Sequence, residues 1–170
     1  MLVAVVGPSG AGKDTVLDGL RHAGHVVARR AITRPAGAGG EAHVAMGEAE
    51  FAEHDFALQW RAHGLGYGIF REIEAEMAQG RVVLANLSRT VLAQAAARYP
   101  LAVLEITAPP AILAERLAAR GREAAADIAA RLAREAPLPP GLRVLRVVND
   151  TTPAAAIASA EKLLASLKTS

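Results

Sequence analysis

Cysteine is absent from the 170-residue sequence, and aromatic residues make up only 4% of it. Without Cys the chain has no disulfide, no thiolate nucleophile and no Cys-ligated zinc site, so its stability has to come from packing. Because rings are so few, that packing falls mainly to Ala, Leu, Val and Ile. The lack of Cys fits a reducing compartment.

An excess of charge of one sign is also missing, since 19 Lys and Arg residues face 17 Asp and Glu residues, a net charge of +2. Binding to nucleic acid or to an anionic membrane needs a larger or more clustered basic excess, so we expect neither partner. The apolar opening at residues 2–6 stops at Gly7, far short of the roughly 20 residues that span a bilayer, and it has no basic flank or cleavage site. We expect a soluble, cytoplasmic protein.

The sequence does contain enough apolar material for one core. Apolar residues make up 52% and charged residues 21%, which excludes disorder, and domains usually take roughly 100–200 residues. Apolar runs predict five buried strands, at 2–6, 25–28, 81–85, 101–106 and 143–148. Helical patterns lie at 15–22, 70–79, 88–98, 110–120, 124–135 and 153–167. This alternation predicts an α/β fold of three layers around a five-stranded, mostly parallel central sheet.

Two stretches interrupt the alternation. Residues 33–69 begin rich in Gly and Ala, continue with polar and aromatic residues, and predict an inserted substrate-binding subdomain. Residues 116–135 are rich in Arg and predict a helical lid. We therefore expect one domain over 1–170, with its core at 1–32, 80–115 and 140–170.

Residues Gly7–Lys13, the phosphate loop, match the first seven positions of the pattern Gly-x-x-x-x-Gly-Lys-[Ser/Thr]. A buried strand precedes the loop and a helical pattern follows it, as this motif requires. Such a loop wraps a polyphosphate with its backbone N–H groups, and Lys13 adds a mobile positive charge. A Gly-rich turn with an incidental Lys is the alternative. The expected ATP-binding residues are Gly7, Pro8, Ser9, Gly10, Ala11, Gly12, Lys13, Asp14 and Thr15.

The eighth position of the pattern is Asp14, where a Ser or Thr hydroxyl normally binds Mg²⁺. A carboxylate beside phosphates is unfavourable unless a metal lies between them. The acidic Mg²⁺ partner that usually ends an apolar strand is also missing, because the strand at 81–85 is followed by neutral Asn86. Our hypothesis is that Asp14 helps to hold Mg²⁺; alternatively, it caps the helix or pairs with a nearby Arg.

Motifs along nearly the full chain resemble those of guanylate-kinase-type P-loop kinases. Besides the phosphate loop they are Ile32-Thr33-Arg34-Pro35, Gly40-Glu41, Gly64-Leu65-Gly66-Tyr67-Gly68, Pro109-Pro110, Arg116-Leu117, Arg120-Gly121, Arg131-Leu132 and Val148-Asn149-Asp150. The resemblance implies a kinase that uses ATP and Mg²⁺. It also implies catalytic roles for Lys13 and for three lid arginines, Arg116, Arg120 and Arg131, which would close over the phosphates. A solvated or Glu-paired helix face is the alternative for these arginines.

The sequence departs from the guanylate kinase pattern at positions that would bind the phosphoryl acceptor. Two acids read the guanine edge in guanylate kinases, and the corresponding places here are Leu58 and Ser88. Without those acids each buried purine N–H would lack a partner, at a cost on the order of 1–3 kcal/mol. The second Arg of the phosphate segment is missing, and His43 stands where a phosphate-binding Tyr is expected. Guanine recognition is therefore not expected.

Four further motifs closely resemble those of the ribose 1,5-bisphosphate phosphokinases of bacterial phosphonate catabolism. They are Gly12-Lys13-Asp14, Ile32-Thr33-Arg34, Asn86-x-Ser88-Arg89 and Ala119-Arg120-Gly121-Arg122-Glu123. This resemblance implies transfer of the γ-phosphoryl group of ATP to ribose 1,5-bisphosphate, giving 5-phosphoribosyl 1-diphosphate. An acceptor with two phosphates and a sugar needs cations and hydroxyl partners but offers no base edge. The expected substrate-binding residues are Arg34, Glu41, Tyr67, Ser88 and Arg89.

Alternatives remain open for several of these residues and for the function. Glu41 could orient Arg34, Tyr67 could be core packing, and Arg89 could be a surface residue. Trp60 is most simply a core anchor of the insert. A nucleoside monophosphate kinase is the alternative enzyme, and a non-catalytic guanylate-kinase-like scaffold is the alternative of another class. The sequence leaves the choice between monomer and homodimer open.

Overall fold

The computed structural model describes residues 1–34, 43–119 and 136–168 and is built around a central sheet of five parallel strands. The strand order is β2-β7-β1-β8-β9. Their bounds are β1 Leu2–Val6, β2 Val26–Val27, β7 Val83–Asn86, β8 Leu101–Thr107 and β9 Arg143–Val148. The α/β fold and the five-stranded sheet predicted from the sequence are confirmed.

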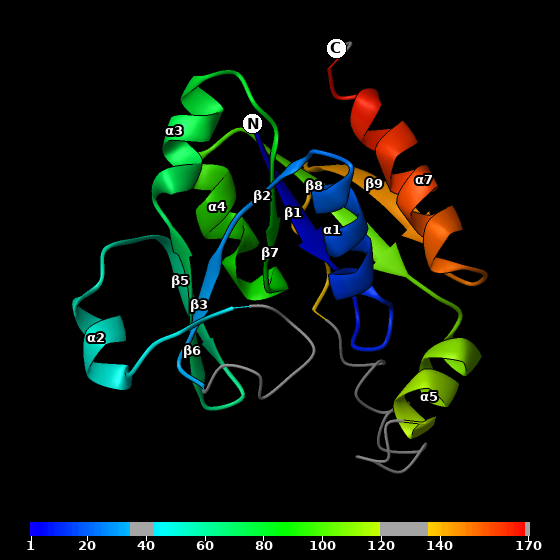
Figure 1. Ribbon diagram of the computed structural model, residues 1–170, viewed down its shortest axis with the longest axis horizontal. Coiled ribbons are helices and arrows are strands. Elements are labelled where there is room, and N and C mark those ends of the chain that lie inside the picture. The colour runs from blue at the N-terminus through cyan, green and yellow to red at the C-terminus, as the bar shows by residue number, and fades with distance from the viewer. Residues whose placement is uncertain (35–42, 120–135, 169–170) are drawn as a thin grey trace.

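Helices cover both faces of this sheet (Figure 1). Their bounds are α1 Lys13–His22, α3 Glu72–Ala78, α4 Leu92–Arg98, α5 Pro110–Ala119 and α7 Pro153–Ala165, with a 3-10 turn, η1, at Arg89–Val91. Because successive side chains of a strand point to opposite faces, Val3 and Val5 of β1 pack under α1 and α7, whereas Leu2 and Ala4 pack under α3 and α4. The predicted helix at 124–135 and most of the predicted lid lie outside the described residues.

The last strand differs in detail from its prediction as a buried strand. In the described part of the chain β9 is an edge strand that pairs with β8 alone, and from Val144 onward exposed and buried residues alternate. Leu145 and Val147 are buried, whereas Val148 is 51% exposed. An apolar run therefore marks a strand, but burial of both faces also requires an element that covers each face.

A second sheet contains the strands of the predicted insert, in the order β4-β3-β6-β5. Their bounds are β3 Arg30–Ile32, β4 Val44–Ala45, β5 Phe56–Ala62 and β6 Leu65–Phe70, and a short helix, α2 Glu48–Glu53, precedes β5. The sequence placed residues 30–32 in the core segment, but they pair with β6 of this sheet. Only two residues separate β2 from β3, so one continuous extended segment runs from the central sheet into the second sheet (Figure 1).

Among the described residues, none of the helices has the length and apolar content needed to cross a membrane.

Three phenylalanines belong to a small apolar cluster at the second sheet. The rings of Phe51 and Phe56 lie 4.9 Å apart, and those of Phe56 and Phe70 lie 5.5 Å apart. A Cβ at Gly68 of β6 would lie 2.6 Å from ring carbons of Phe56. Glycine therefore leaves the space that the Phe56 ring fills.

We predict that Gly68→Ala destabilises the protein by about 1–3 kcal/mol, because the Phe56 ring is 5% exposed and has little room to move. The free energy of unfolding from urea denaturation measures the effect. Gly47→Ala is the control, since a Cβ there meets nothing within 4 Å, and it should cost less than about 1 kcal/mol. Equal losses for the two variants would contradict the packing argument.

Candidate active site

The phosphate loop joins β1 to α1 through glycines in backbone conformations that other residues avoid. Gly10 and Gly12 have φ of 85° and 88°. Gly7 has no room for a side chain at all, because a Cβ there would lie 2.0 Å from the carbonyl oxygen of Ile106. Lys13, the first residue of α1, donates a hydrogen bond from Nζ to the Gly7 carbonyl. The loop has the strand, turn and helix that the sequence pattern predicted.

Two side chains from distant parts of the chain hold the loop in place. Asn149, just after β9, is 6% exposed and donates from Nδ2 to the carbonyl of Ala11 at 2.8 Å. Arg116 of α5 donates from Nη1 to the Gly10 carbonyl at 3.2 Å and from Nη2 to the Asn149 carbonyl at 2.8 Å. Sequence reasoning missed this anchoring role of Asn149, although the Val148-Asn149-Asp150 motif marked the position.

The predicted lid arginines are only partly described. Arg116 lies beside the phosphate loop and contacts two backbone carbonyls there. Arg120 and Arg131 lie outside the described residues, as does Glu41. Their roles stay predictions.

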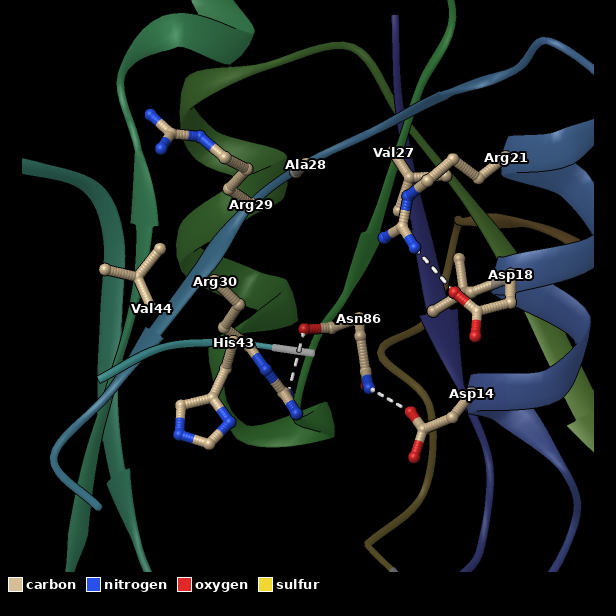
Figure 2. A pocket seen from close by; sticks show the side chains of 11 residues that line it. Asp14, Asp18, Arg21, Val27, Ala28, Arg29, Arg30, His43, Val44 and Asn86 are labelled. Carbon is tan, nitrogen blue, oxygen red and sulfur yellow. Dashed lines mark hydrogen bonds and ion pairs between the residues drawn. The ribbon is translucent and has the colours of Figure 1, made fainter. Parts of the chain in front are cut away.

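Asp14 and Asn86, which the sequence argument linked through Mg²⁺, lie side by side. The Nδ2 of Asn86, at the end of β7, donates to Oδ1 of Asp14 in the first turn of α1 at 3.4 Å (Figure 2). Within the described ranges no group of three His, Asp or Glu residues could hold a metal ion. Mg²⁺ at nucleotide sites commonly takes one or two carboxylates and completes its shell with phosphate oxygens and water, so this single carboxylate beside the loop fits the ion.

Asp14 and Asn86 also line a cleft of about 300 Å³ between α1 and the β2–β3 segment (Figure 2). One wall carries the acids of α1, Asp14 and Asp18. The other wall carries the guanidinium of Arg30, with His43 nearby, whereas the guanidinium of Arg29 points away from them and pairs with Glu72 (Figure 2). The remaining lining residues are Leu17, Arg21, Val27, Ala28 and Val44. Because Arg21 of the same helix pairs with Asp18, the charges that face each other across the cleft are chiefly those of Asp14 and Arg30, an arrangement that suits an anionic ligand bound together with a cation.

The predicted acceptor residues that the structure describes lie on or next to the second sheet and just after β7. Tyr67 on β6 stacks on Trp60, with ring centroids 5.4 Å apart and planes 7° apart. Trp60 packs partly buried against the core, in line with its prediction as an anchor. The carbonyl of Arg34 accepts a hydrogen bond from Nε2 of His43 at 3.1 Å. Ser88 caps η1, where its Oγ accepts from the Thr90 N–H at 3.3 Å.

Arg89 has contacts of a structural kind. Its Nη2 donates to the buried Glu105 at 3.0 Å and its Nη1 to the carbonyl of Ala136 at 2.8 Å. Arg146 binds the second oxygen of Glu105 at 2.6 Å. Arg89 thus links β8 to the chain just after the predicted lid, and its role as an acceptor cation stays a prediction.

Sequence reasoning missed Arg30, the first residue of β3. Its Nη1 donates to the Asn86 carbonyl at 3.3 Å, and its guanidinium carbon lies 5.1 Å from the Tyr67 ring centroid. The sequence feature that could have indicated Arg30 is its position four residues before Arg34, at the start of a strand. Leu58, where a guanylate kinase would carry an acid, is 1% exposed inside an apolar cluster.

Comparison with known proteins decides the family. The chain is 51% identical to the ribose 1,5-bisphosphate phosphokinase PhnN of Acidiphilium cryptum, over 91% of this chain and 87% of that protein. It is 48% identical to the PhnN phosphokinase of a Ruegeria species, over 96% and 90%. The chain belongs to the ribose 1,5-bisphosphate phosphokinase family.

Other relatives of this phosphokinase family are longer. A bifunctional ribose 1,5-bisphosphokinase-thymidine phosphorylase of Azorhizobium caulinodans is 52% identical to the chain, which spans 96% of its own length but only 25% of that protein. No family model matches the chain.

Solved structures show the same fold at low sequence identity. A guanylate kinase from Anaplasma phagocytophilum superposes with a TM-score of 0.64 at 18% identity, over 98% of this chain and 85% of that one. A gluconokinase from Sinorhizobium meliloti gives 0.52 at 17% identity, over 97% and 91%. The chain therefore has the P-loop kinase fold that the sequence predicted.

We predict that Asn149→Asp weakens ATP binding about 10- to 100-fold, because a carboxylate would replace the N–H that holds the Ala11 carbonyl and would repel that oxygen. Titration calorimetry with ATP and Mg²⁺ measures the dissociation constant. Gln94→Glu, which adds the same charge at an exposed site on α4, should leave it within about twofold. Unchanged affinity in folded Asn149→Asp protein would show that the loop does not need this anchor.

Proposed function

We propose that the chain transfers the γ-phosphoryl group of ATP to ribose 1,5-bisphosphate and releases 5-phosphoribosyl 1-diphosphate and ADP. The observation that carries the proposal is the identity of about half the residues to relatives named ribose 1,5-bisphosphate phosphokinase, over about nine tenths of both chains. The geometry of the phosphate loop and the charged cleft beside it supports the same chemistry.

The donor side of the proposed reaction is the phosphate loop. Its N–H groups and the start of α1 would bind the ATP phosphates, where the helix dipole adds positive potential. Lys13 would leave the Gly7 carbonyl and meet the β- and γ-phosphates. Arg116 lies close enough to the loop to neutralise charge on the transferring group, together with Arg120 and Arg131 as proposed from the sequence.

The acceptor in this proposal needs positioning rather than activation. An oxygen of the C1 phosphate attacks the γ-phosphorus, a new P–O bond forms, and the bond from the γ-phosphorus to the bridging oxygen breaks as ADP leaves. Since a phosphate is already ionised at neutral pH, no general base is required. Arg34, Glu41, Tyr67, Ser88 and Arg89 remain the proposed acceptor residues.

ATP and Mg²⁺ are the proposed cofactors, and Asp14 is the proposed protein ligand of Mg²⁺, steadied by Asn86. When bound, the ion would neutralise phosphate charge during transfer. The proposed partners are small molecules only, and we propose the cytoplasm as the place of action.

We predict that, among phosphorylated acceptors, ribose 1,5-bisphosphate is preferred. The full chain is incubated with ATP and Mg²⁺ and with ribose 1,5-bisphosphate, GMP, dGMP, AMP or UMP, and products are followed by phosphorus NMR. Without an acid at Leu58 to read a base, nucleotides should react poorly. Preferential turnover of a nucleotide would favour the alternative kinase, and failure of the folded protein to bind ATP would favour a scaffold.

Lys13→Ala is the control for that experiment. Transfer should fall on the order of 10²- to 10³-fold, while thermal stability should stay close to that of the unchanged protein because Lys13 is not part of the apolar core. Residual transfer at the original rate would point to a contaminating kinase.

We predict that Asp14→Asn raises the Mg²⁺ concentration needed for half-maximal activity about tenfold or more, because the metal loses its charged protein ligand. Mg²⁺ titrations of both activity and ATP binding measure the effect. Asp18→Asn, one helical turn further along the same cleft wall, is the matched control and should change the requirement less than about threefold. Identical titrations for Asp14→Asn and the unchanged protein would exclude Asp14 as a metal ligand.

A further inference from the structure

Both faces of the Tyr67 ring are taken by side chains of its own sheet. β6, which carries Tyr67, lies between β5 and β3. From β5, Trp60 stacks on the ring, with centroids 5.4 Å apart. From β3, Arg30 places its guanidinium carbon 5.1 Å from the ring centroid. Because β5 and β3 flank β6 on opposite sides, Trp60 and Arg30 approach the Tyr67 ring from opposite sides.

Arg30 also reaches the nucleotide side of the molecule. Its Nη1 donates to the carbonyl of Asn86, whose side chain contacts Asp14 beside the phosphate loop (Figure 2). The guanidinium thus lines the cleft at the junction of the two sheets. A guanidinium is a planar fork that binds two oxygens of one phosphate, and a ring below it holds the plane in place.

We infer that Arg30 is a substrate-binding residue that determines specificity: it binds a phosphate of the sugar bisphosphate in the cleft, and it occupies the face of Tyr67 on which a nucleobase would stack. The inference rests on the proposed function. It explains with one side chain both how the site attracts an anionic sugar and how it rejects a nucleotide. Leu58, buried in the apolar cluster, contributes to the second effect only by lacking a carboxylate.

The neighbouring residue, Arg29, provides a matched comparison. Arg29 lies directly before β3 in the extended segment, where adjacent side chains point to opposite sides, and its Nε and Nη2 each donate to a Glu72 oxygen at 2.8 Å. Its guanidinium also lies 4.9 Å from the Phe70 ring. The hydrogen bond from Arg29 lowers the pKa of Glu72 below its usual value. The two arginines have the same charge and adjacent positions, but only Arg30 contacts Tyr67 and Asn86.

The test compares Arg30→Gln with Arg29→Gln in the full chain. Arg30→Gln should raise the KM for ribose 1,5-bisphosphate about 10- to 150-fold, the value of charged hydrogen bonds to a phosphate. Its dissociation constant for ATP should stay within about twofold. Arg29→Gln should change neither quantity more than about threefold. Arg30→Lys, which keeps the charge but loses the fork, should fall between the two.

GMP supplies the second measurement. Removal of the guanidinium opens one face of Tyr67, so the ratio of kcat/KM for ribose 1,5-bisphosphate to that for GMP should fall about 100-fold or more in Arg30→Gln. A merely structural role would lower the melting temperature and weaken ATP and bisphosphate binding together. That result, or a bisphosphate KM within about threefold of the original value, would overturn the inference.

Failure of the proposed function would be recognised separately. If the unchanged protein does not phosphorylate ribose 1,5-bisphosphate, the proposed reaction is wrong, and calorimetric titration with this compound then decides the role of Arg30 alone. Binding that weakens in Arg30→Gln but not in Arg29→Gln would support the inference. Absent binding, or equal binding by all three proteins, would overturn it.

Discussion

The complete burial of β1 is the constraint on which the site depends. All five of its residues are at most 1% exposed, and the two apolar clusters of the core meet across this strand. A strand so fixed ends at one place only, and there the chain must turn at Gly7, against the carbonyl of Ile106 on β8. The phosphate loop is therefore positioned by the packing of the sheet, and Asn149 and Arg116 hold its carbonyls from outside.

Features that depend on local sequence could be predicted. The apolar runs gave the strands of the central sheet because burial on two faces leaves a continuous apolar signal. The phosphate loop could be recognised because its glycines, Lys13 and the flanking elements are contiguous. The contact of Asp14 with Asn86, a finding of the structure, is explained by the rule that parallel strands end at one edge of a sheet.

Features that depend on distant pairing could not be predicted. Asn149 and Ala11 are 138 residues apart in the chain, and nothing local indicates that they touch. The position of Arg30 over Tyr67 follows from the pairing of β3 with β6, which the sequence did not indicate. The ion pair of Arg89 with Glu105 likewise joins residues of different elements, and the sequence did not indicate that these two side chains meet.

The pair Arg29 and Arg30 shows how strand parity assigns roles to identical residues. Arg29 faces Glu72 and Phe70, whereas Arg30 faces Asn86 and Tyr67. A one-residue slip of β3 against β6 would exchange the two environments without altering the composition or the charge of the chain. The insertion or deletion of one residue between Val27 and Arg30 would thus change which arginine reaches the cleft. A sequence alignment would still show two adjacent arginines. In this segment, the number of residues between β2 and each arginine determines its contacts as much as the residue type does.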